Sequence, residues 1–179
     1  MTPEEREGDE DVHAPTAIVI TASNRASSGV YPDRSGPVLA GLLEEAGCAV
    51  DGPRVVPDGA PVADALRRAL AEGYDAAVTT GGTGLTPGDE TPEATRPLLV
   101  YEIPGIAEAL RAAGREKGVP TAVLSRGLAG VAERDGHRML VVNLPGSSGG
   151  VRDGMAVLGP ILRHAIDQMR GGDHPRTGG

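Results

Sequence analysis

Short apolar runs alternate along the chain with longer segments in which apolar residues recur every three or four positions. Residues 16–21 and 76–80 are apolar or β-branched throughout, which is typical of strands buried on both faces of a sheet. Residues 48–56 predict another strand, which Gly52-Pro53 interrupts. Strands that alternate with helical segments indicate a mainly parallel sheet covered by helices.

Three internal segments have the spacing of apolar residues that one face of a helix requires. Residues 37–46 begin with a proline, which the first helical turn tolerates, and they end before Gly47, which supplies the stop. Residues 61–72 and 105–118 carry similar apolar stripes. Each helix therefore has one face to bury, and the sheet is the surface that would cover it.

The carboxyl-terminal part departs from this alternation. Residues 123–133 and 139–144 each predict a strand, and the polar turn 134–138 between them favours an antiparallel pair. A last helix follows the loop 145–150, and we expect Pro160 to kink or divide it. The fold class predicted is therefore α/β, with a mainly parallel sheet and a C-terminal antiparallel strand pair.

The length of 179 residues allows one α/β domain with a sizeable core and leaves no room for a second. We expect that domain at residues 15–170, between a disordered acidic tail at 1–14 and a flexible tail at 171–179. The first 13 residues carry six acidic side chains and one basic one, which accounts for five of the eight net negative charges. The remainder lacks the basic face that a nucleic acid requires.

Composition also limits the cellular locations and the kinds of metal site that we expect. The single cysteine, Cys48, allows no internal disulfide, and no apolar run reaches the roughly 18 residues of a membrane span. The N-terminus is acidic and lacks an apolar stretch, so we expect no signal peptide. The four histidines are scattered without the spacing of zinc ligands. These features predict a cytoplasmic protein that binds neither membrane nor nucleic acid.

The clearest local sign of a binding site is the glycine-rich stretch 81–89, which joins the strand 76–80 to an expected helix start at Thr91. Its glycines allow positive φ angles and bring backbone N–H groups close to a ligand, and a helix start favours phosphate. A plain strand-to-helix turn explains the spacing equally well. Neither a dinucleotide fingerprint nor a Walker A loop fits, because Pro87 replaces the third glycine and the only lysine, Lys117, lies far away.

A second glycine-rich loop, at 143–150, also leaves a strand and enters a helix. If the two strands run parallel, both loops lie at one edge of the sheet and indicate a ligand with several anionic groups. An ordinary helix start capped by Ser147 or Ser148 is the alternative. Asp58 and Asp89 each follow a strand, where paired carboxylates can hold Mg²⁺, although Pro-Asp-Gly around Asp58 is also typical of a turn. Four arginines beside these loops are candidate phosphate partners: Arg25, Arg34, Arg126 and Arg152.

Four segments together carry a recognisable combination of motifs: 79–84, 89–95, 120–126 and 143–147. They resemble the MoaB/Mog family of molybdenum cofactor biosynthesis proteins. The first loop, with Arg-Ala-Ser-Ser-Gly-Val-Tyr at 25–31, looks like that of the catalytic Mog branch, the molybdopterin adenylyltransferases. The resemblance implies a compact three-layer α/β/α domain, usually a homotrimer, that binds molybdopterin and ATP with Mg²⁺. It further implies adenylylation of molybdopterin with release of pyrophosphate, and a downstream molybdenum insertion enzyme as a partner.

The same resemblance assigns roles to particular residues. Asp58 and Asp89 match acidic residues that the family uses for Mg²⁺ and nucleotide, so we expect both to be catalytic and metal-binding. The other expected cofactor-binding residues are Thr80, Gly81, Gly82, Thr83, Gly84, Ser125, Arg126, Asn143, Pro145, Gly146 and Ser147. Family members commonly carry aspartate where this chain has Asn24, which leaves the role of that position open.

Three other functions share these motifs. A MoaB-type paralogue would hold molybdopterin with little or no catalysis, and its loops would look nearly the same. The fold also occurs in amidohydrolases related to competence proteins and in the molybdenum insertion enzyme, both of which are normally longer chains. The 25–31 loop and the two aspartates favour the adenylyltransferase.

Overall fold

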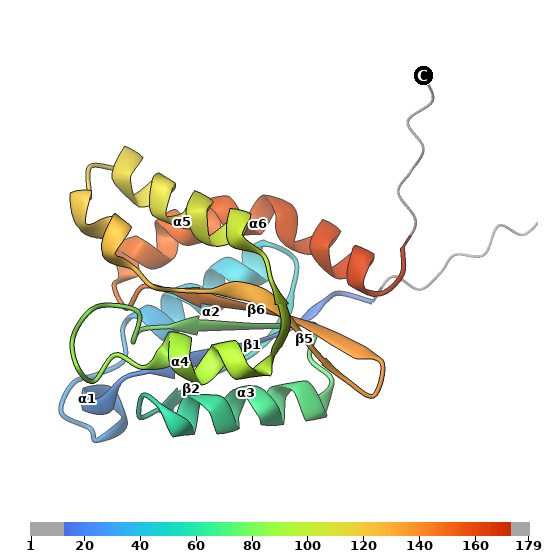
Figure 1. Ribbon diagram of the computed structural model, residues 1–179, viewed down its shortest axis with the longest axis horizontal. Helices are drawn as coiled ribbons and strands as arrows, with labels where there is room; N and C mark the ends of the chain where they lie inside the picture. Colours follow the sequence, from blue (N-terminus) through green and yellow to red (C-terminus); the bar gives the residue numbers. More distant parts are fainter. Residues whose placement is uncertain (1–12, 173–179) are drawn as a thin grey trace, which may run out of the picture.

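The computed structural model describes residues 13–172, so the predicted tails at 1–14 and 171–179 lie almost entirely outside the described residues. A six-stranded sheet in the order β2-β1-β3-β6-β5-β4 forms the middle of the molecule (Figure 1). Its strands are β1 (Thr16–Ala22), β2 (Ala49–Val56), β3 (Ala76–Thr80), β4 (Leu99–Glu102), β5 (Ala129–Arg134) and β6 (His137–Leu144). The pairs β1–β2, β1–β3 and β3–β6 are parallel, whereas β5 is antiparallel to β6 and to β4. The predicted mainly parallel sheet with an antiparallel pair is confirmed.

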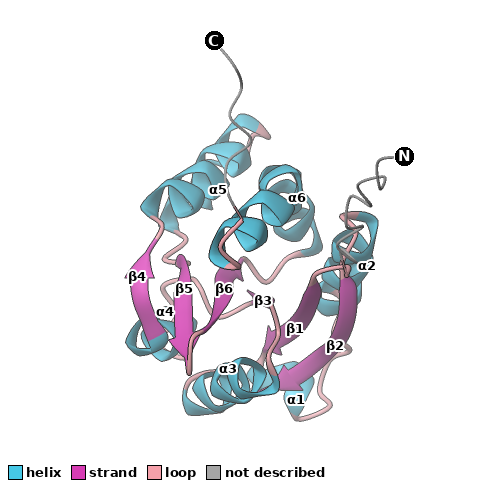
Figure 2. Ribbon diagram, turned by 90° about the vertical axis from the view of Figure 1, so that its right-hand side faces the viewer, coloured by secondary structure: helices cyan, strands magenta, loops and turns pink. Residues whose placement is uncertain are grey.

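Helices cover both faces of this sheet, which gives the three α/β/α layers expected (Figure 2). One face carries α2 (Ser35–Glu45), α5 (Pro104–Glu116) and α6 (Ser148–Met169), and the other carries α3 (Ala60–Glu72) and α4 (Thr91–Thr95). The short helix α1 (Asn24–Ser27) and the 3-10 helices η1 (Arg96–Leu98) and η2 (Pro120–Leu124) lie in connections. Within residues 13–172, no helix is both long and apolar enough to cross a membrane.

The interior strand β1 shows why both helical layers form. Ala17 and Val19 pack with α2 and α6 in the core of one face, whereas Ile18 and Ile20 pack with α3 in the core of the other. Successive side chains of a strand point to opposite faces, so a run that is apolar without alternation is what this position in the sheet requires. Burial of each isoleucine stabilises the fold by about 1.5–3 kcal/mol.

Some element boundaries differ from the sequence prediction. The predicted strand over residues 123–133 is wrong in its first part, because Pro120–Leu124 forms η2 and β5 begins after it. Val123 and Leu124 are about half exposed, so their apolar character does not reflect a place in the sheet. The edge strand β4 is absent from the prediction, since three of its four residues are exposed and show no alternation. Pro160 lies exposed within α6 and does not divide the helix.

Candidate functional site

The loops that follow β3 and β6 lie side by side at one edge of the sheet, as expected of parallel strands (Figure 1). The Gly81 N–H donates to the Leu144 carbonyl at 3.0 Å, and the Thr80 hydroxyl donates to the Pro145 carbonyl at 2.7 Å. A Cβ placed on Gly146 would lie 3.2 Å from the Gly81 Cα. The two glycine-rich loops therefore form one continuous rim.

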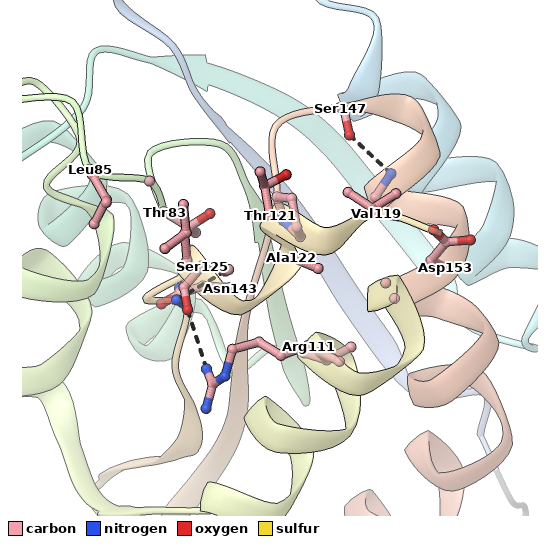
Figure 3. A pocket seen from close by; sticks show the side chains of 18 of the residues that line it. Thr83, Leu85, Arg111, Val119, Thr121, Ala122, Ser125, Asn143, Ser147 and Asp153 are labelled. Carbon is pink, nitrogen blue, oxygen red and sulfur yellow. Dashed lines mark hydrogen bonds between the residues drawn. The ribbon is translucent and has the colours of Figure 1, made fainter. Parts of the chain in front are cut away.

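A cavity of about 740 Å³ opens between this rim, α5, η2 and the start of α6 (Figure 3). Its lining, mainly apolar with a few polar groups, includes Thr83, Leu110, Ala122, Leu124, Ser125 and Asn143. The Arg111 guanidinium donates a long hydrogen bond of 3.4 Å to the Ser125 carbonyl, drawn as a dashed line in Figure 3. Such a combination is typical of a site for a small organic ligand.

A second cavity, of about 510 Å³, lies on the opposite side of the same glycine loop. Residues 81–82 line this cavity, and residues 83–84 line the first one. Its charged and aromatic lining comes from the connection between β1 and α2: Arg25, Tyr31, Asp33 and Arg34. The Arg25 guanidinium lies 5.7 Å from the centroid of the Tyr31 ring. The second cavity therefore places two arginines beside the glycine loop, a chemistry that suits phosphate.

Only glycine fits at two positions of the loop that separates the cavities. Gly81 and Gly82 have φ angles of +98° and +67°, which L-residues rarely adopt. A Cβ on Gly81 would lie 2.3 Å from the Ala22 carbonyl oxygen, and a Cβ on Gly82 would lie 2.0 Å from the Asp58 Oδ2. The predicted positive φ angles are found at Gly81 and Gly82 but not at Gly84 and Gly88, and the close approaches are to the protein itself.

Asp58 lies against the glycine loop, and both of its carboxylate oxygens accept hydrogen bonds. Oδ1 accepts from the Thr91 hydroxyl and from the Gly59 N–H, each at 2.7 Å, and Oδ2 accepts from the Glu90 N–H at 3.0 Å. The carboxylate thus satisfies donors at the start of α4 that the helix itself leaves without partners. Asp58 is therefore fixed in place by the segment that follows the glycine loop.

Asn24 contributes to the same arrangement. Its Oδ1 accepts a hydrogen bond from the Asp58 N–H at 3.0 Å. An amide oxygen accepts this bond as a carboxylate would, so the absence of an aspartate here does not leave the N–H without a partner. The sequence pattern singled out Asn24 only as a departure from the family and gave no sign of this contact.

Asp89 lies on the other side of the loop, where a Cβ on Gly84 would come within 2.8 Å of its Oδ2. Oδ2 accepts from the Thr86 N–H at 3.1 Å, and the Asp89 N–H donates to the Thr86 carbonyl at 2.8 Å. No hydrogen bond from the described part of the chain reaches Oδ1. Of the two aspartates, Asp89 therefore keeps the oxygen that is more available to a ligand.

Arg126, predicted from the sequence to contact the cofactor, directs its guanidinium to protein acceptors. Nε donates to the Gly84 carbonyl at 2.9 Å, and Nη2 donates to the Asp89 carbonyl at 2.7 Å. Nη1 donates to the Glu93 carboxylate. This hydrogen bond is the main reason that the pKa of Glu93 lies below its usual value of 4.5. A direct contact between Arg126 and a ligand stays a prediction.

Asn143 is buried beneath the first cavity and joins three parts of the fold. Its Oδ1 accepts from the Leu128 N–H at 3.1 Å, and its Nδ2 donates to the hydroxyls of Thr79 and Thr95 at 3.0 and 3.1 Å. The whole residue is only 2% exposed. Asn143 therefore links β6 to β3, α4 and the segment that leads into β5.

The two serines expected at the site also make local contacts. The Ser147 hydroxyl accepts from the Gly150 N–H at 3.0 Å and caps α6, as Figure 3 shows. The Ser125 hydroxyl accepts from the Gly127 N–H at 3.3 Å. Both residues line the first cavity, so capping and ligand contact are compatible here. The cavity walls formed by α5 and η2 are absent from the sequence prediction, because nothing in their sequence distinguishes them from ordinary amphipathic segments.

The carboxylates near the glycine loop bear on whether the site could hold a metal ion. Within residues 13–172, His, Cys, Asp and Glu side chains form no group of three that could hold a metal by themselves. Magnesium usually takes one or two carboxylates and completes its shell with water and phosphate oxygens. Asp58 and Asp89 beside the glycine loop are carboxylates of the kind that Mg²⁺ takes together with a phosphate ligand, and that they hold the ion stays a prediction.

Comparisons with known proteins agree with this geometry. Residues 18–164 match a family model described as a probable molybdopterin binding domain. The chain is 34% identical over 160 residues to the molybdopterin adenylyltransferase of Helicobacter pylori strain J99, a match that covers 86% of each chain. The solved structure of the molybdopterin biosynthesis Mog protein from Mycobacterium ulcerans is similar with a TM-score of 0.81 and 48% identity, over 89% of this chain and 99% of that one.

A longer relative shares the same region. The molybdenum cofactor biosynthesis bifunctional protein of Synechococcus elongatus is 40% identical over 163 residues, which cover 88% of this chain and 48% of that protein. A bifunctional protein of the same name from Chlorobaculum tepidum is covered to 51%. The chain thus spans about half the length of these bifunctional relatives.

Proposed function

As the chain belongs to the molybdopterin-binding domain family, we propose that it transfers the adenylyl group of ATP to the terminal phosphate of molybdopterin and releases pyrophosphate. The observation that carries this proposal is the pair of cavities on either side of one glycine loop. The product has two organic halves joined by a diphosphate, so it requires two pockets with a phosphate-binding strip between them. Relatives named molybdopterin adenylyltransferase that match over most of their length support the same activity.

The phosphates would lie over the rim formed by the two loops. Gly82 has no side chain that would keep a phosphate from its backbone N–H, whereas the Gly81 N–H is bound to the Leu144 carbonyl. The start of α6, a helix of 22 residues, faces the first cavity and adds its partial positive charge. Arg25 and Arg34 in the second cavity add full positive charge. These groups neutralise the negative charge that would otherwise keep two phosphate-bearing substrates apart.

In the proposed reaction, a phosphate oxygen of molybdopterin attacks the α-phosphorus of ATP. The new P–O bond forms as the bond between the α-phosphorus and the oxygen bridging to the β-phosphate breaks, and that oxygen leaves with pyrophosphate. The chain's residues contribute by orienting the two substrates and neutralising charge, and no covalent enzyme intermediate is needed. Cys48, a potential nucleophile, is buried in the core of the α2–α6 face.

Asp58 and Asp89 are the residues that would hold Mg²⁺. When bound there, the ion would supply charge neutralisation at the phosphates of ATP. Asp89 offers an oxygen that no hydrogen bond from residues 13–172 reaches, and Asp58 offers a carboxylate whose orientation is fixed by Thr91 and Glu90. The two aspartates would thus act differently: the Asp58 carboxylate is already oriented by the protein, whereas the Asp89 carboxylate remains open to the substrate complex.

The family resemblance also supports three proposals about context. The chain would act in the cytoplasm, as a homotrimer, and would pass its product to a molybdenum insertion enzyme. Val100 and Tyr101 on the edge strand β4 are 55% and 47% exposed, which fits a surface covered by another subunit. Light scattering after size-exclusion chromatography tests the trimer, and a monomeric mass would contradict it.

The aspartates provide the test of the proposed site. Asp89→Ala should lower the rate of pyrophosphate release with molybdopterin, ATP and Mg²⁺ by at least about 10²-fold, because it removes charge at the reacting phosphates. The fold should remain intact, since the substitution removes no core volume. Asp58→Ala should lose activity and also some thermal stability, because it breaks hydrogen bonds at the start of α4.

Asp64→Ala is the matched control. Asp64 is a surface aspartate of α3 that pairs with Arg67, and both side chains are more than half exposed. This variant should keep the activity and stability of the wild type. Unchanged turnover in Asp89→Ala would overturn the proposed site, and molybdopterin binding without turnover in the wild type would assign the chain to the binding-protein class instead.

A further inference from the structure

All three guanidinium nitrogens of Arg126 donate a hydrogen bond to an acceptor within residues 13–172. No other arginine near the two glycine loops does so within these residues. Two acceptors are the carbonyls of Gly84 and Asp89, and the third is the Glu93 carboxylate. Three of the five N–H groups of this guanidinium are therefore held by the protein itself. These three bonds join separate parts of the site.

The two carbonyls that Arg126 binds lie at the two ends of one exposed loop. Between Gly84 and Asp89 the chain projects outward, and Leu85 at its start is 65% exposed. Inside the loop, the hydrogen bonds found are those between Thr86 and Asp89. One side chain thus fixes both ends of the segment that carries the Asp89 carboxylate.

The backbone of Arg126 belongs to the wall of the first cavity. Its N–H donates to the Thr83 carbonyl at 2.8 Å, and its neighbours Ser125 and Gly127 line the cavity. Through Glu93 the same residue reaches α4, the helix whose start Asp58 caps. Arg126 therefore connects the cavity wall to the loop that carries Asp89 and to α4, whose start is hydrogen-bonded to Asp58.

We infer that Arg126 is a positioning residue, which holds the loop at residues 84–89 so that the Asp89 carboxylate stays aligned with Asp58 and with the cavity. This inference rests on the proposed adenylyl transfer for its effect on rate. The tethering itself follows from the hydrogen bonds alone. Without the tether, the loop would keep its own turn and the backbone bonds of the flanking Thr83 and Glu90, but the carbonyls of Gly84 and Asp89 would lose the side chain that joins them.

The test compares Arg126→Gln and Arg126→Lys with the wild type. Lysine keeps the charge but has a single nitrogen, which cannot reach three separate acceptors. Arg126→Lys should therefore restore little of the activity that Arg126→Gln loses. In both variants kcat should fall by about 30- to 100-fold, the loss expected when a reacting group is displaced by about 1 Å. The Mg²⁺ concentration that gives half the maximal rate should rise, whereas KM for molybdopterin should change by less than about 3-fold, since no ligand contact is removed.

Hydrogen–deuterium exchange of the ligand-free protein supplies a readout independent of turnover. Amides of residues 84–93 should exchange faster in Arg126→Gln, while those of β6 should be unchanged. Glu93→Gln should have a small effect, because both backbone contacts of Arg126 remain. Arg138→Gln is the matched control, since it breaks the exposed Arg138–Glu133 pair of the β5–β6 hairpin, away from the cavities.

Two results would overturn the inference. One is a raised KM for molybdopterin or ATP with unchanged kcat and unchanged loop exchange, which would make Arg126 a ligand-binding residue. The other is full rescue by Arg126→Lys, which would reduce its role to a charge. Absence of transfer in the wild type would refute the proposed function alone, because the exchange experiment would still test the tether.

Discussion

Replacing Asn143 with alanine should destabilise the protein more than replacement of any exposed asparagine. The variant loses three hydrogen bonds, to the Leu128 N–H and to the hydroxyls of Thr79 and Thr95. Each such bond contributes about 1 kcal/mol net, and a buried donor left without a partner costs about 1–3 kcal/mol. The two bonds to hydroxyls account for about 2 kcal/mol and the Leu128 N–H left without a partner for about 1–3 kcal/mol, so the expected loss is about 3–5 kcal/mol.

Urea denaturation followed by far-UV circular dichroism measures this loss, and it suits a chain without tryptophan. With a slope of about 2 kcal/mol per molar urea, the midpoint should fall by about 1.5–2.5 M while the slope stays the same. Because domains of this kind are typically stable by about 5–15 kcal/mol, the variant should still fold in water.

Asn24→Ala is the matched control for the Asn143 variant. Asn24 is exposed and accepts one hydrogen bond, from the Asp58 N–H, so its replacement should cost less than about 1 kcal/mol. If Asn143→Ala lost no more stability than Asn24→Ala, the buried amide would not be holding β6 to β3 and α4, and the reasoning would be refuted.

Two further predictions concern Gly82 and Cys48. Gly82→Ala places a Cβ 2.0 Å from the Asp58 Oδ2, and its positive φ costs about 1–2 kcal/mol. The variant should therefore lower both the unfolding midpoint and the transfer rate. Gly159→Ala is the control: its Cβ would meet nothing within 4 Å, so it should lower neither. Burial, and to a lesser degree Asp75, raises the pKa of the Cys48 thiol above 9.0, so a thiol reagent at pH 8 should label the native protein far more slowly than the unfolded one. Equal labelling rates would contradict the buried, protonated thiol.

The sequence predicts the elements whose pattern is local. The strand Ala76–Thr80 is found with its observed bounds, because a parallel strand between two helical layers must be apolar throughout. The helix Ala60–Glu72 is found within one residue, because its apolar stripe, its early proline and the glycine after it all act within the segment. By contrast, Val123 and Leu124 look like strand residues and lie exposed in η2, since only tertiary contacts decide where β5 begins.

The features of the candidate site that could be predicted are likewise those that follow from the strand pattern, and the contacts between distant residues could not be predicted. That both glycine loops share one edge of the sheet follows from parallel strands and is confirmed by the pairing of β3 with β6. The contacts of Asp58 with Thr91 and Asn24 join positions about 33 residues apart in the chain, and no sequence spacing encodes them. Arg126 shows the same limit, because an arginine beside a glycine loop looks like a phosphate partner whether it binds a ligand or the loop itself.

The measurement that tests the central claim most directly is mass spectrometry of the wild-type protein incubated with molybdopterin, ATP and Mg²⁺. We predict adenylylated molybdopterin and an equal amount of pyrophosphate, with both products lost when a chelator removes Mg²⁺. Molybdopterin held tightly by the protein while ATP remains intact would contradict adenylyl transfer.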